Sequence, residues 1–315
     1  MEQKELKEAI LKLKKEKNAV ILGHYYQRDE IQEVSDFVGD SLALAQEARR
    51  TKCDIIVFCG VHFMAETAKI LNPERKVLLP DMEANCSLAR SCPADAFSKF
   101  KAAHPDHLVI SYINCSAEIK ALSDLICTSG NAEKLVNALP KEQKIIFAPD
   151  KNLGGYINRQ TGRNMLLWDG TCTVHDALTA ESILRLKLQH PQAEVIAHPE
   201  CNGAVLKVAS FIGSTKAMLN YIHTSPSRQF IVATESGILY EMKQNNPDKE
   251  FFAVSSDEGC ACLECADMKL NTLEKLYKCI SQELPEITLS DDMIQKARKP
   301  IERMLEMSQQ LGIIK

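Results

Sequence analysis

Short apolar strands and helical segments alternate along the whole chain, and the alternation runs three times. The expected strands of the three passes are 19–22, 55–58 and 77–79, then 108–110, 125–127 and 145–148, and last 194–197, 210–212, 230–232 and 251–254. Such alternation is typical of parallel sheets with helices on both faces. The sequence therefore predicts an α/β protein of three small, pseudo-symmetric three-layer αβα domains, which we place at residues 1–87, 88–175 and 176–270. We expect the helices of residues 271–315 to pack on the first of them.

A cysteine-containing loop ends each pass. Cys86 closes the first pass and Cys172 the second, while Cys260, Cys262 and Cys265 crowd the loop after the third. Ligands of parallel sheets bind beyond the carboxyl ends of the strands, so we expect these loops to meet at one centre and to give one thiolate each. Spacing alone does not choose among the three cysteines of the last loop.

Composition fits an ordinary globular protein and excludes some classes of function. The chain of 315 residues is 45% hydrophobic and 25% charged, and its formal net charge of −4 offers no basic surface for nucleic acid. No window approaches the roughly 18 apolar residues of a membrane span, and the charged amphipathic helix expected at residues 4–16 lacks the apolar core of a signal peptide. We therefore expect a cytoplasmic protein with no nucleic-acid or membrane partner.

Twelve cysteines in a chain expected to be cytoplasmic argue against a disulfide framework. Five of them sit inside or beside apolar runs, where a free cysteine is commonly a small buried residue. These are Cys53, Cys59, Cys115, Cys127 and Cys279. The cysteines of the loops after strands are the exceptions and the candidates for ligands.

Three thiolates suit an iron–sulfur centre. They can hold a [4Fe-4S] cluster at three irons and leave the fourth open as a Lewis acid for a substrate oxygen, an arrangement that favours dehydration over electron transfer. Three alternatives stay open at this point. They are a hydro-lyase of the aconitase type acting on another acid, a non-enzymatic iron–sulfur sensor or scaffold, and a structural zinc protein.

Eleven segments, in order along nearly the whole chain, closely resemble the quinolinate synthase family. They are GHYYQ (23–27), GDSLALA (39–45), FCGVHFMAETAKIL (58–71), CSLA (86–89), YIN (112–114), CTSGNA (127–132), WDGTCTVH (168–175), HPEC (198–201), GST (213–215), TESG (234–237) and CADMKLNTLEKLY (265–277). The resemblance implies three α/β domains around a central [4Fe-4S] cluster. It also implies condensation of iminoaspartate with dihydroxyacetone phosphate to quinolinate, phosphate and two waters in NAD biosynthesis.

Carried over by position, the resemblance implies Cys86, Cys172 and Cys265 as the cluster ligands. Cys265 is preferred because the family's ligand cysteine precedes x-x-Met and an Asn-x-Leu helix start, as in CADMKLN. Some family members have C-x-x-C-x-x-C here, whereas this chain has Cys260-x-Cys262-x-x-Cys265. The spacing between the first two cysteines therefore differs. A redox pair and extra thiols for cluster loading are the two interpretations of these residues.

The same resemblance supports roles for polar residues at the strand ends. We expect Glu200 as general base, Tyr26 and Tyr112 as acids or oxyanion donors, and His198 as a further catalytic residue. Substrate contacts are expected from His24, Asp40, Ser41, Tyr112, Asn114, Ser129, His198, Glu200, Ser214 and Thr215. Structural roles are the alternatives: packing for the tyrosines, helix capping for the loops of Ser129, Ser214 and Thr215, a structural role at the strand end for His24 and His198, and a solvated position at a helix start for Glu200.

The sequence assigns no single role to two further histidines. His175 follows ligand Cys172 by three residues, so it either contacts the cluster region or orients its loop. His62 has no evident task in the chemistry. From the implied pathway, we expect an aspartate-oxidising enzyme and cluster-assembly proteins as partners, although no residue points to either.

Overall fold

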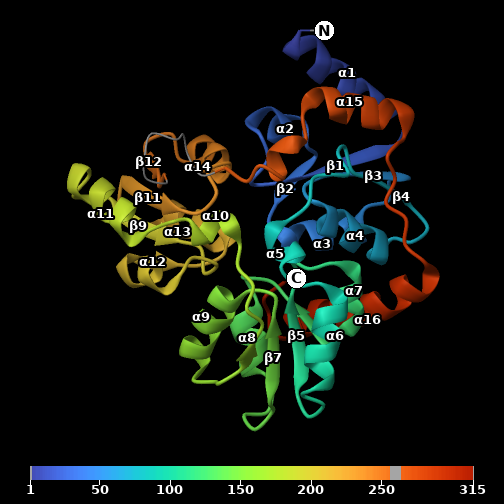
Figure 1. The fold of residues 1–315 in the computed structure, drawn as a ribbon. Helices are drawn as coiled ribbons and strands as arrows, with labels where there is room; N and C mark the ends of the chain where they lie inside the picture. The colour runs from blue at the N-terminus through green and yellow to red at the C-terminus, as the bar shows by residue number, and fades with distance from the viewer. Residues whose placement is uncertain (1, 256–263, 315) are drawn as a thin grey trace.

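Three four-stranded parallel sheets form the framework of the chain (Figure 1). The structure is a computed structural model that describes residues 2–255 and 264–314. Each sheet has the same strand order, with its second strand at one edge, then its first, third and fourth. The predicted α/β fold with three pseudo-symmetric αβα units is therefore confirmed.

The strands fall into three sets of four along the chain. The first set is β1 (Ala19–His24), β2 (Phe37–Gly39), β3 (Ile55–Cys59) and β4 (Lys76–Leu78). The second set is β5 (Leu108–Tyr112), β6 (Leu125–Cys127), β7 (Ile145–Ala148) and β8 (Leu166–Leu167). The third set is β9 (Glu194–Ala197), β10 (Phe211–Ile212), β11 (Gln229–Ala233) and β12 (Glu250–Ala253). We call the three units repeats 1, 2 and 3.

Helices connect the strands and cover the sheets. Those of repeat 1 are α1 (Gln3–Glu16), α2 (Asp29–Val34), α3 (Ser41–Arg50) and α4 (His62–Leu71). Those leading into and through repeat 2 are α5 (Ser87–Arg90), α6 (Ala94–Ala102), α7 (Ala117–Leu122), α8 (Ala132–Asn137) and α9 (Lys151–Thr161). Repeat 3 is preceded by α10 (Thr173–Asp176) and α11 (Ala180–Gln189) and contains α12 (Gly203–Val208), α13 (Thr215–Thr224) and α14 (Ile238–Asn245). A 3₁₀ turn, η1 (Met268–Leu270), then leads to α15 (Leu273–Gln282) and α16 (Asp291–Gln310).

The central strands are apolar because both of their faces are covered. Every residue of β1 is buried, and its neighbours in the sheet are β2 and β3. A strand with helices on both faces needs a continuous apolar run rather than an alternating one. The run at residues 19–22 meets this requirement, and so do the cores of β5 and β9.

Two elements lack a clear signal in the sequence. The edge strand β2 has only three residues, which pair with β1, and no apolar run marks them. Residues 151–161 form α9 although two glycines and two asparagines discourage a helix. Gly154 explains why α9 tolerates them: a Cβ there would lie 2.6 Å from Leu167 and 2.8 Å from Phe147. The helix can lie this close to its sheet only with glycine at that position.

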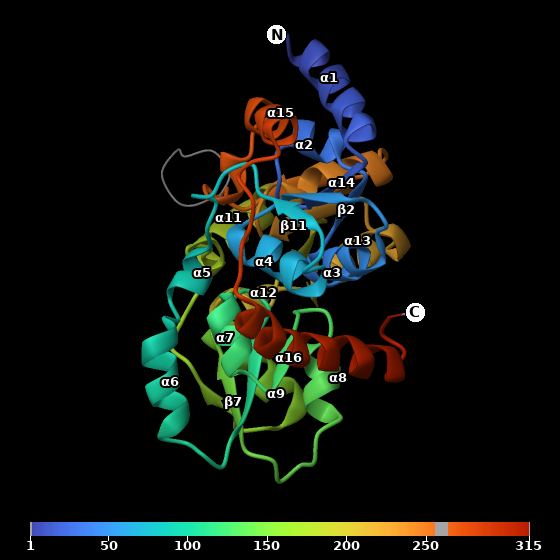
Figure 2. The same ribbon diagram turned by 90° about the vertical axis from the view of Figure 1, so that its right-hand side faces the viewer.

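The last two helices have different neighbours. α15 packs against α1 on repeat 1, whereas α16 lies mainly against α7 and β6 of repeat 2 and also reaches α4 of repeat 1 (Figure 2). α16 continues through Pro300, and the Ser290 side chain caps its first turn by accepting from the Met293 N–H. None of the helices in the described ranges combines the length and apolarity needed to cross a bilayer.

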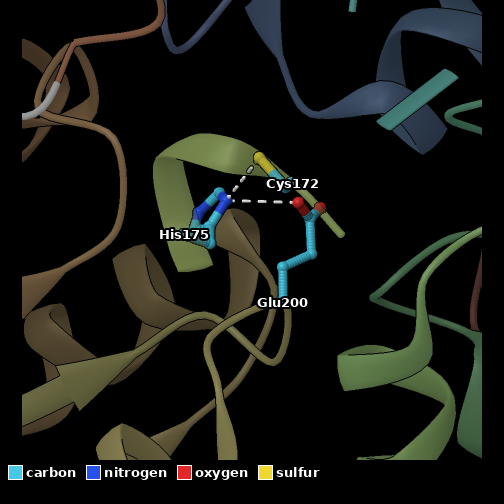
Figure 3. Close-up of side chains that lie close together, drawn as sticks. All are labelled: Cys172, His175 and Glu200. Atoms are coloured by element: carbon cyan, nitrogen blue, oxygen red, sulfur yellow. Dashed lines mark hydrogen bonds and ion pairs between the residues drawn. The ribbon is translucent and has the colours of Figure 1, made fainter. Parts of the chain in front are cut away.

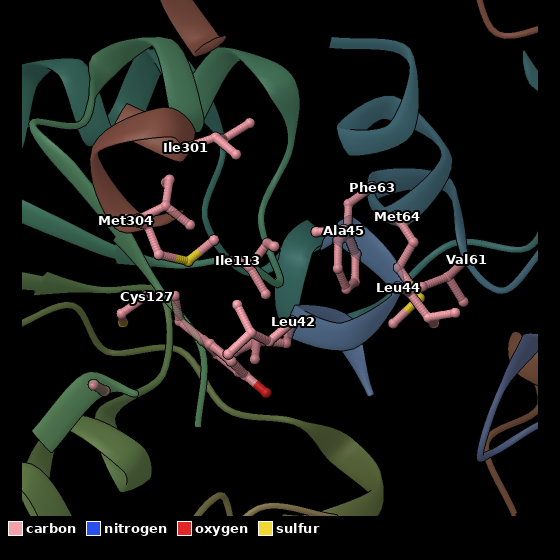
Figure 4. Packing of buried hydrophobic residues seen from close by; sticks show 14 of the residues in the cluster. Leu42, Leu44, Ala45, Val61, Phe63, Met64, Ile113, Cys127, Ile301 and Met304 are labelled. Carbon is pink, nitrogen blue, oxygen red and sulfur yellow. The ribbon is translucent and has the colours of Figure 1, made fainter. Parts of the chain in front are cut away.

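One apolar cluster joins repeats 1 and 2 through α16. Figure 4 shows Leu42 and Phe63, from α3 and α4, in the same cluster as Ile113, Ile301 and Met304. Ile301 and Met304 are fully buried. α16 therefore contributes to the packing that holds two repeats together.

Truncating Ile301 tests this role. Ile301→Ala should lower the free energy of unfolding by about 2–5 kcal/mol, because the deleted atoms leave a cavity between α16 and repeat 2. Urea denaturation of the metal-free protein measures the loss. Leu188→Ala, at a residue 82% exposed on α11, is the control and should change stability by less than about 0.5 kcal/mol. Equal stability of the two variants would contradict the assigned packing.

Candidate active site

The loops after the strands of all three repeats line one pocket with about 660 Å³ of empty space, its open mouth included. Its walls mix aliphatic, aromatic, hydroxyl, imidazole, carboxylate and thiol groups. The lining residues are His24, Tyr26, Asp40, Ser41, Val61, Phe63, Met64, Asn85, Cys86, Tyr112, Asn114, Thr128, Ser129, Cys172, Val174, His175, His198, Glu200, Thr215, Glu235, Cys265 and Met268. A concave site with converging polar groups is the usual form of a small-molecule site.

The repeats contribute to this pocket from equivalent places. The carboxyl ends of the first strands and the loops that follow them give three pairs of residues spaced by two: His24 and Tyr26, Tyr112 and Asn114, and His198 and Glu200. The loops after the second strands give Asp40 and Ser41, Thr128 and Ser129, and Thr215. The loops after the fourth strands give Cys86, Cys172 and Cys265. The internal symmetry thus brings one thiol from each repeat to the same place.

The three cysteines share a local geometry. Cys86 and Cys172 immediately precede α5 and α10, and Cys265 lies just before η1. Burial raises the pKa of Cys86 to about 12, that of Cys265 to about 11 and that of Cys172 well above its usual range. In each case the backbone N–H three residues later donates a hydrogen bond to the sulfur, which lowers the pKa and partly offsets burial.

These thiols fit a metal cofactor of more than one atom. Buried thiols remain protonated unless a cation stabilises the thiolate, and amides directed at the sulfurs are typical of iron–sulfur sites. Across the described ranges, the only compact set of three ligand atoms, all within 4.8 Å of one another, is that of Cys172, His175 and Glu200. The three sulfurs are therefore spaced more widely than a single ion requires, although they line one pocket.

Glu200 lies where side chains from different repeats meet. The Tyr112 hydroxyl donates to its Oε1 at 2.6 Å, and the His175 Nδ1 lies 3.1 Å from its Oε2 (Figure 3). His198 Nδ1 is 3.7 Å from Oε1. Burial alone would raise the pKa of Glu200, but His175, His198 and the Tyr112 hydrogen bond lower it to about 2. The carboxylate is therefore ionised at neutral pH.

A chain of hydrogen bonds links the two active-site tyrosines through Glu200. Because an ionised carboxylate only accepts, His175 Nδ1 carries a proton on the side that faces Glu200. His175 Nε2 lies 2.8 Å from the Thr234 hydroxyl, and that hydroxyl is hydrogen-bonded to the Tyr26 hydroxyl at 2.7 Å. All three repeats contribute residues to this series of hydrogen bonds, which fixes the orientation of both phenols.

His24 and His198, which also line the pocket, are neutral. Burial lowers the pKa of His24 and of His198 to about 3, and the nearby Glu200 only partly offsets this effect. His198 Nε2 lies 3.1 Å from the Ser129 hydroxyl, and His24 Nδ1 accepts the Tyr26 backbone N–H at 3.1 Å. These hydrogen bonds hold each imidazole in one orientation.

The structure places nearly every expected site residue on the pocket wall. Ser214 is the exception: it caps α13, accepting the Ala217 N–H at 3.3 Å. His62 also lies away from the wall and faces Glu66, with 3.6 Å between Nδ1 and Oε1. Cys260 and Cys262 lie outside the described residues, so the choice between a redox pair and loading thiols stays open.

Sequence reasoning missed a buried ion pair at the pocket wall, between Glu235 and Lys269. Glu235 Oε1 accepts the Cys265 backbone N–H and lies 3.0 Å from Lys269 Nζ. Lys269 in turn donates to the Tyr26 carbonyl at 2.7 Å. The pair thereby ties the loop of Cys265 to the loop of Tyr26. Both residues occur in the segments quoted above, but a charged residue in a loop is usually solvated, and nothing in the sequence pairs two positions this far apart.

Buried thiols, an ionised carboxylate and oriented phenols in one pocket are typical of an α/β enzyme that takes a metal cofactor. A family model described as quinolinate synthetase A protein matches residues 8–306. The chain belongs to this family of enzymes.

Two relatives illustrate how close the similarity is. A quinolinate synthase of a Nostoc species is 62% identical over 300 residues, which are 95% of this chain and 93% of the relative. A quinolinate synthase of Chloroherpeton thalassium is 61% identical over 309 residues, which are 98% of this chain and 96% of the relative. The similarity thus extends through all three repeats.

The buried pair can be tested by a double-mutant cycle. Glu235→Gln and Lys269→Met should each lower the free energy of unfolding by about 3–5 kcal/mol, because each leaves the partner charge buried and uncompensated. The double variant should lose clearly less than the sum of the two. Asp292→Asn with Lys296→Met, at an exposed pair, is the control and should show a coupling near zero. Additive losses at Glu235 and Lys269, measured by urea denaturation of metal-free protein, would contradict the assigned pairing.

Proposed function

We propose that this chain is a quinolinate synthase that condenses iminoaspartate with dihydroxyacetone phosphate to quinolinate, phosphate and two waters in NAD biosynthesis. The family assignment and the names of the relatives support the reaction. One observation carries the proposal: the three repeats bring three thiols, Glu200 and two phenols to the same pocket.

Cys86, Cys172 and Cys265 would hold a [4Fe-4S] cluster in this pocket, one thiolate from each repeat. When bound, the cluster supplies an open iron that acts as a Lewis acid toward a substrate oxygen. The spacing of the thiols and the amides directed at their sulfurs support this assignment over a single ion.

Binding of two anionic substrates falls to neutral groups. Among the lining residues that the structure describes there is no lysine or arginine, so hydroxyls, imidazoles and helix N-termini carry the recognition of carboxylate and phosphate. Ser41 and Thr215 open α3 and α13, and Ser129 lies beside His198. Gly130 allows the second-strand loops of repeats 2 and 3 to approach, since a Cβ there would lie 3.3 Å from the Ser214 hydroxyl. We propose these loops as the anion-binding wall.

Glu200, Tyr26 and Tyr112 would carry the proton transfers. The ionised Glu200 accepts a proton from the substrate during tautomerisation or dehydration. Burial and then the charge of Glu200 raise the pKa of Tyr26 and of Tyr112 well above the usual range, so both phenols keep their protons. A protonated phenol can donate to the hydroxyl that leaves as water. His24, His198, Asp40 and Asn114 complete the polar wall that orients the substrates.

Removing single thiols tests the cofactor. Anaerobically purified or reconstituted wild-type protein should contain about four iron and four sulfide per chain, and Cys86→Ser, Cys172→Ser and Cys265→Ser should each lose most of both. Cys53→Ser, a thiol outside the pocket, is the matched control and should keep them. A colourless zinc protein, or full iron in all three variants, would contradict the cluster assignment.

Neutralising Glu200 tests the chemistry separately from the cofactor. Glu200→Gln keeps the shape and an oxygen for the Tyr112 hydrogen bond but removes the base, so turnover should fall by about 10²-fold or more while iron content is unchanged. The assay measures quinolinate formed from iminoaspartate and dihydroxyacetone phosphate without air, with the exposed Glu181→Gln as control. Wild-type turnover in Glu200→Gln would remove Glu200 from the mechanism. Absence of quinolinate from cluster-loaded wild type would favour another hydro-lyase.

A further inference from the structure

We propose a second metal site in this pocket: in the cluster-free chain, Cys172, His175 and Glu200 bind one divalent transition ion such as Zn²⁺. This site would compete with cluster assembly because both need Cys172. The ion site does not depend on which reaction the enzyme performs.

The ligand atoms are arranged for a single ion. One atom from each of the three residues lies within 4.8 Å of the others, with His175 Nδ1 at 3.2 Å from Cys172 Sγ and 3.1 Å from a Glu200 oxygen (Figure 3). Zinc–ligand bonds of about 2.0–2.3 Å place neighbouring ligands of a tetrahedral ion a little over 3 Å apart. Thiolate, imidazole and carboxylate are the three ligand types that Zn²⁺ accepts in proteins.

The chain presents these atoms together for local reasons. Cys172 and His175 are three residues apart at the start of α10, so their side chains lie on the same side of the turn. Glu200 comes from the loop after β9 in repeat 3. The ligand atoms therefore come from two repeats and face the same pocket.

A hydrogen bond to a neighbouring residue already orients the His175 ring and the Glu200 carboxylate. The Thr234 hydroxyl lies 2.8 Å from His175 Nε2, and the Tyr112 hydroxyl holds the Glu200 oxygen Oε1 at 2.6 Å. Hydrogen bonds of this kind on the far side of histidine and carboxylate ligands are characteristic of zinc sites. Three protein ligands leave a fourth position, which opens to the pocket and can take water.

Binding requires proton movements but no change in oxidation state. The Cys172 S–H bond breaks, the sulfur binds the ion and the proton leaves to water. His175 Nδ1 gives up its proton and binds the ion, while Nε2 carries the ring proton and donates to the Thr234 hydroxyl. The three thiols of the cluster site do not form an equally compact set, so a single ion fits the triad better than Cys86, Cys172 and Cys265.

Anaerobic titration of metal-free protein with Co²⁺ tests the site. We expect one Co²⁺ per chain and an absorption band from a single cobalt–thiolate bond. Cys172→Ser should abolish this band, and His175→Gln should weaken binding by more than about tenfold. Cys86→Ser and Cys265→Ser are matched controls, because they remove cluster ligands but leave the triad intact, and they should bind Co²⁺ like the wild type.

Two results would overturn the proposal. One is stoichiometric Co²⁺ binding that survives Cys172→Ser or is lost in Cys86→Ser, since the ion would then use other ligands. The other is no binding by wild type whose circular dichroism matches that of the cluster-loaded protein. Thr234→Val gives a test that keeps all three ligands: losing the hydrogen bond on Nε2 should weaken Co²⁺ binding by about 10–100-fold.

Competition is measured on the wild-type chain. Preloading with one equivalent of Zn²⁺ should reduce the iron and sulfide taken up during anaerobic reconstitution, and a chelator added beforehand should restore the uptake. Unchanged uptake at full zinc occupancy would show that the ion and the cluster do not share Cys172.

Discussion

The buried negative charge of Glu200 is the interaction on which the site depends most. A carboxylate with no access to water is stable only when donors surround it, and here the donors are Tyr112 and His175 of repeat 2, with His198 close by. The charge also acts on its surroundings. After burial, Glu200 is the largest cause that raises the pKa of Tyr26, Tyr112 and Cys172. Burial and the charge of Glu200 together thus keep the phenols and the Cys172 thiol protonated.

This arrangement follows from the direction of parallel strands. In each repeat the strands supply apolar side chains to the sheet and end at the same edge, where the loops are free to carry polar groups. Three repeats with the same strand order therefore bring equivalent loops to one pocket. In this enzyme of the quinolinate synthetase A family, the strands provide the packing and the loops at their carboxyl ends carry the polar groups of the pocket.

Much of this organisation could be predicted from the sequence. Apolar runs mark buried parallel strands, and a loop after such a run is bound to lie at the carboxyl edge, so the placement of Cys86, Cys172 and Cys265 in one pocket follows from topology. What escaped prediction depends on contacts between distant residues. The edge strand β2 has a single neighbour, α9 relies on Gly154 for its fit to the sheet, and Glu235 needs Lys269 to be buried. Local sequence patterns do not indicate which distant residues will be in contact.

We propose above all that the three repeats bind one iron–sulfur centre, each through one thiolate. Crystals of the protein purified without air, with an anomalous difference map collected at the iron edge, test it most directly. We expect one compact group of iron peaks inside the pocket, bonded to Cys86, Cys172 and Cys265, with one iron that has no protein ligand. Iron outside the pocket, or bound without a thiolate from one of the three repeats, would contradict it.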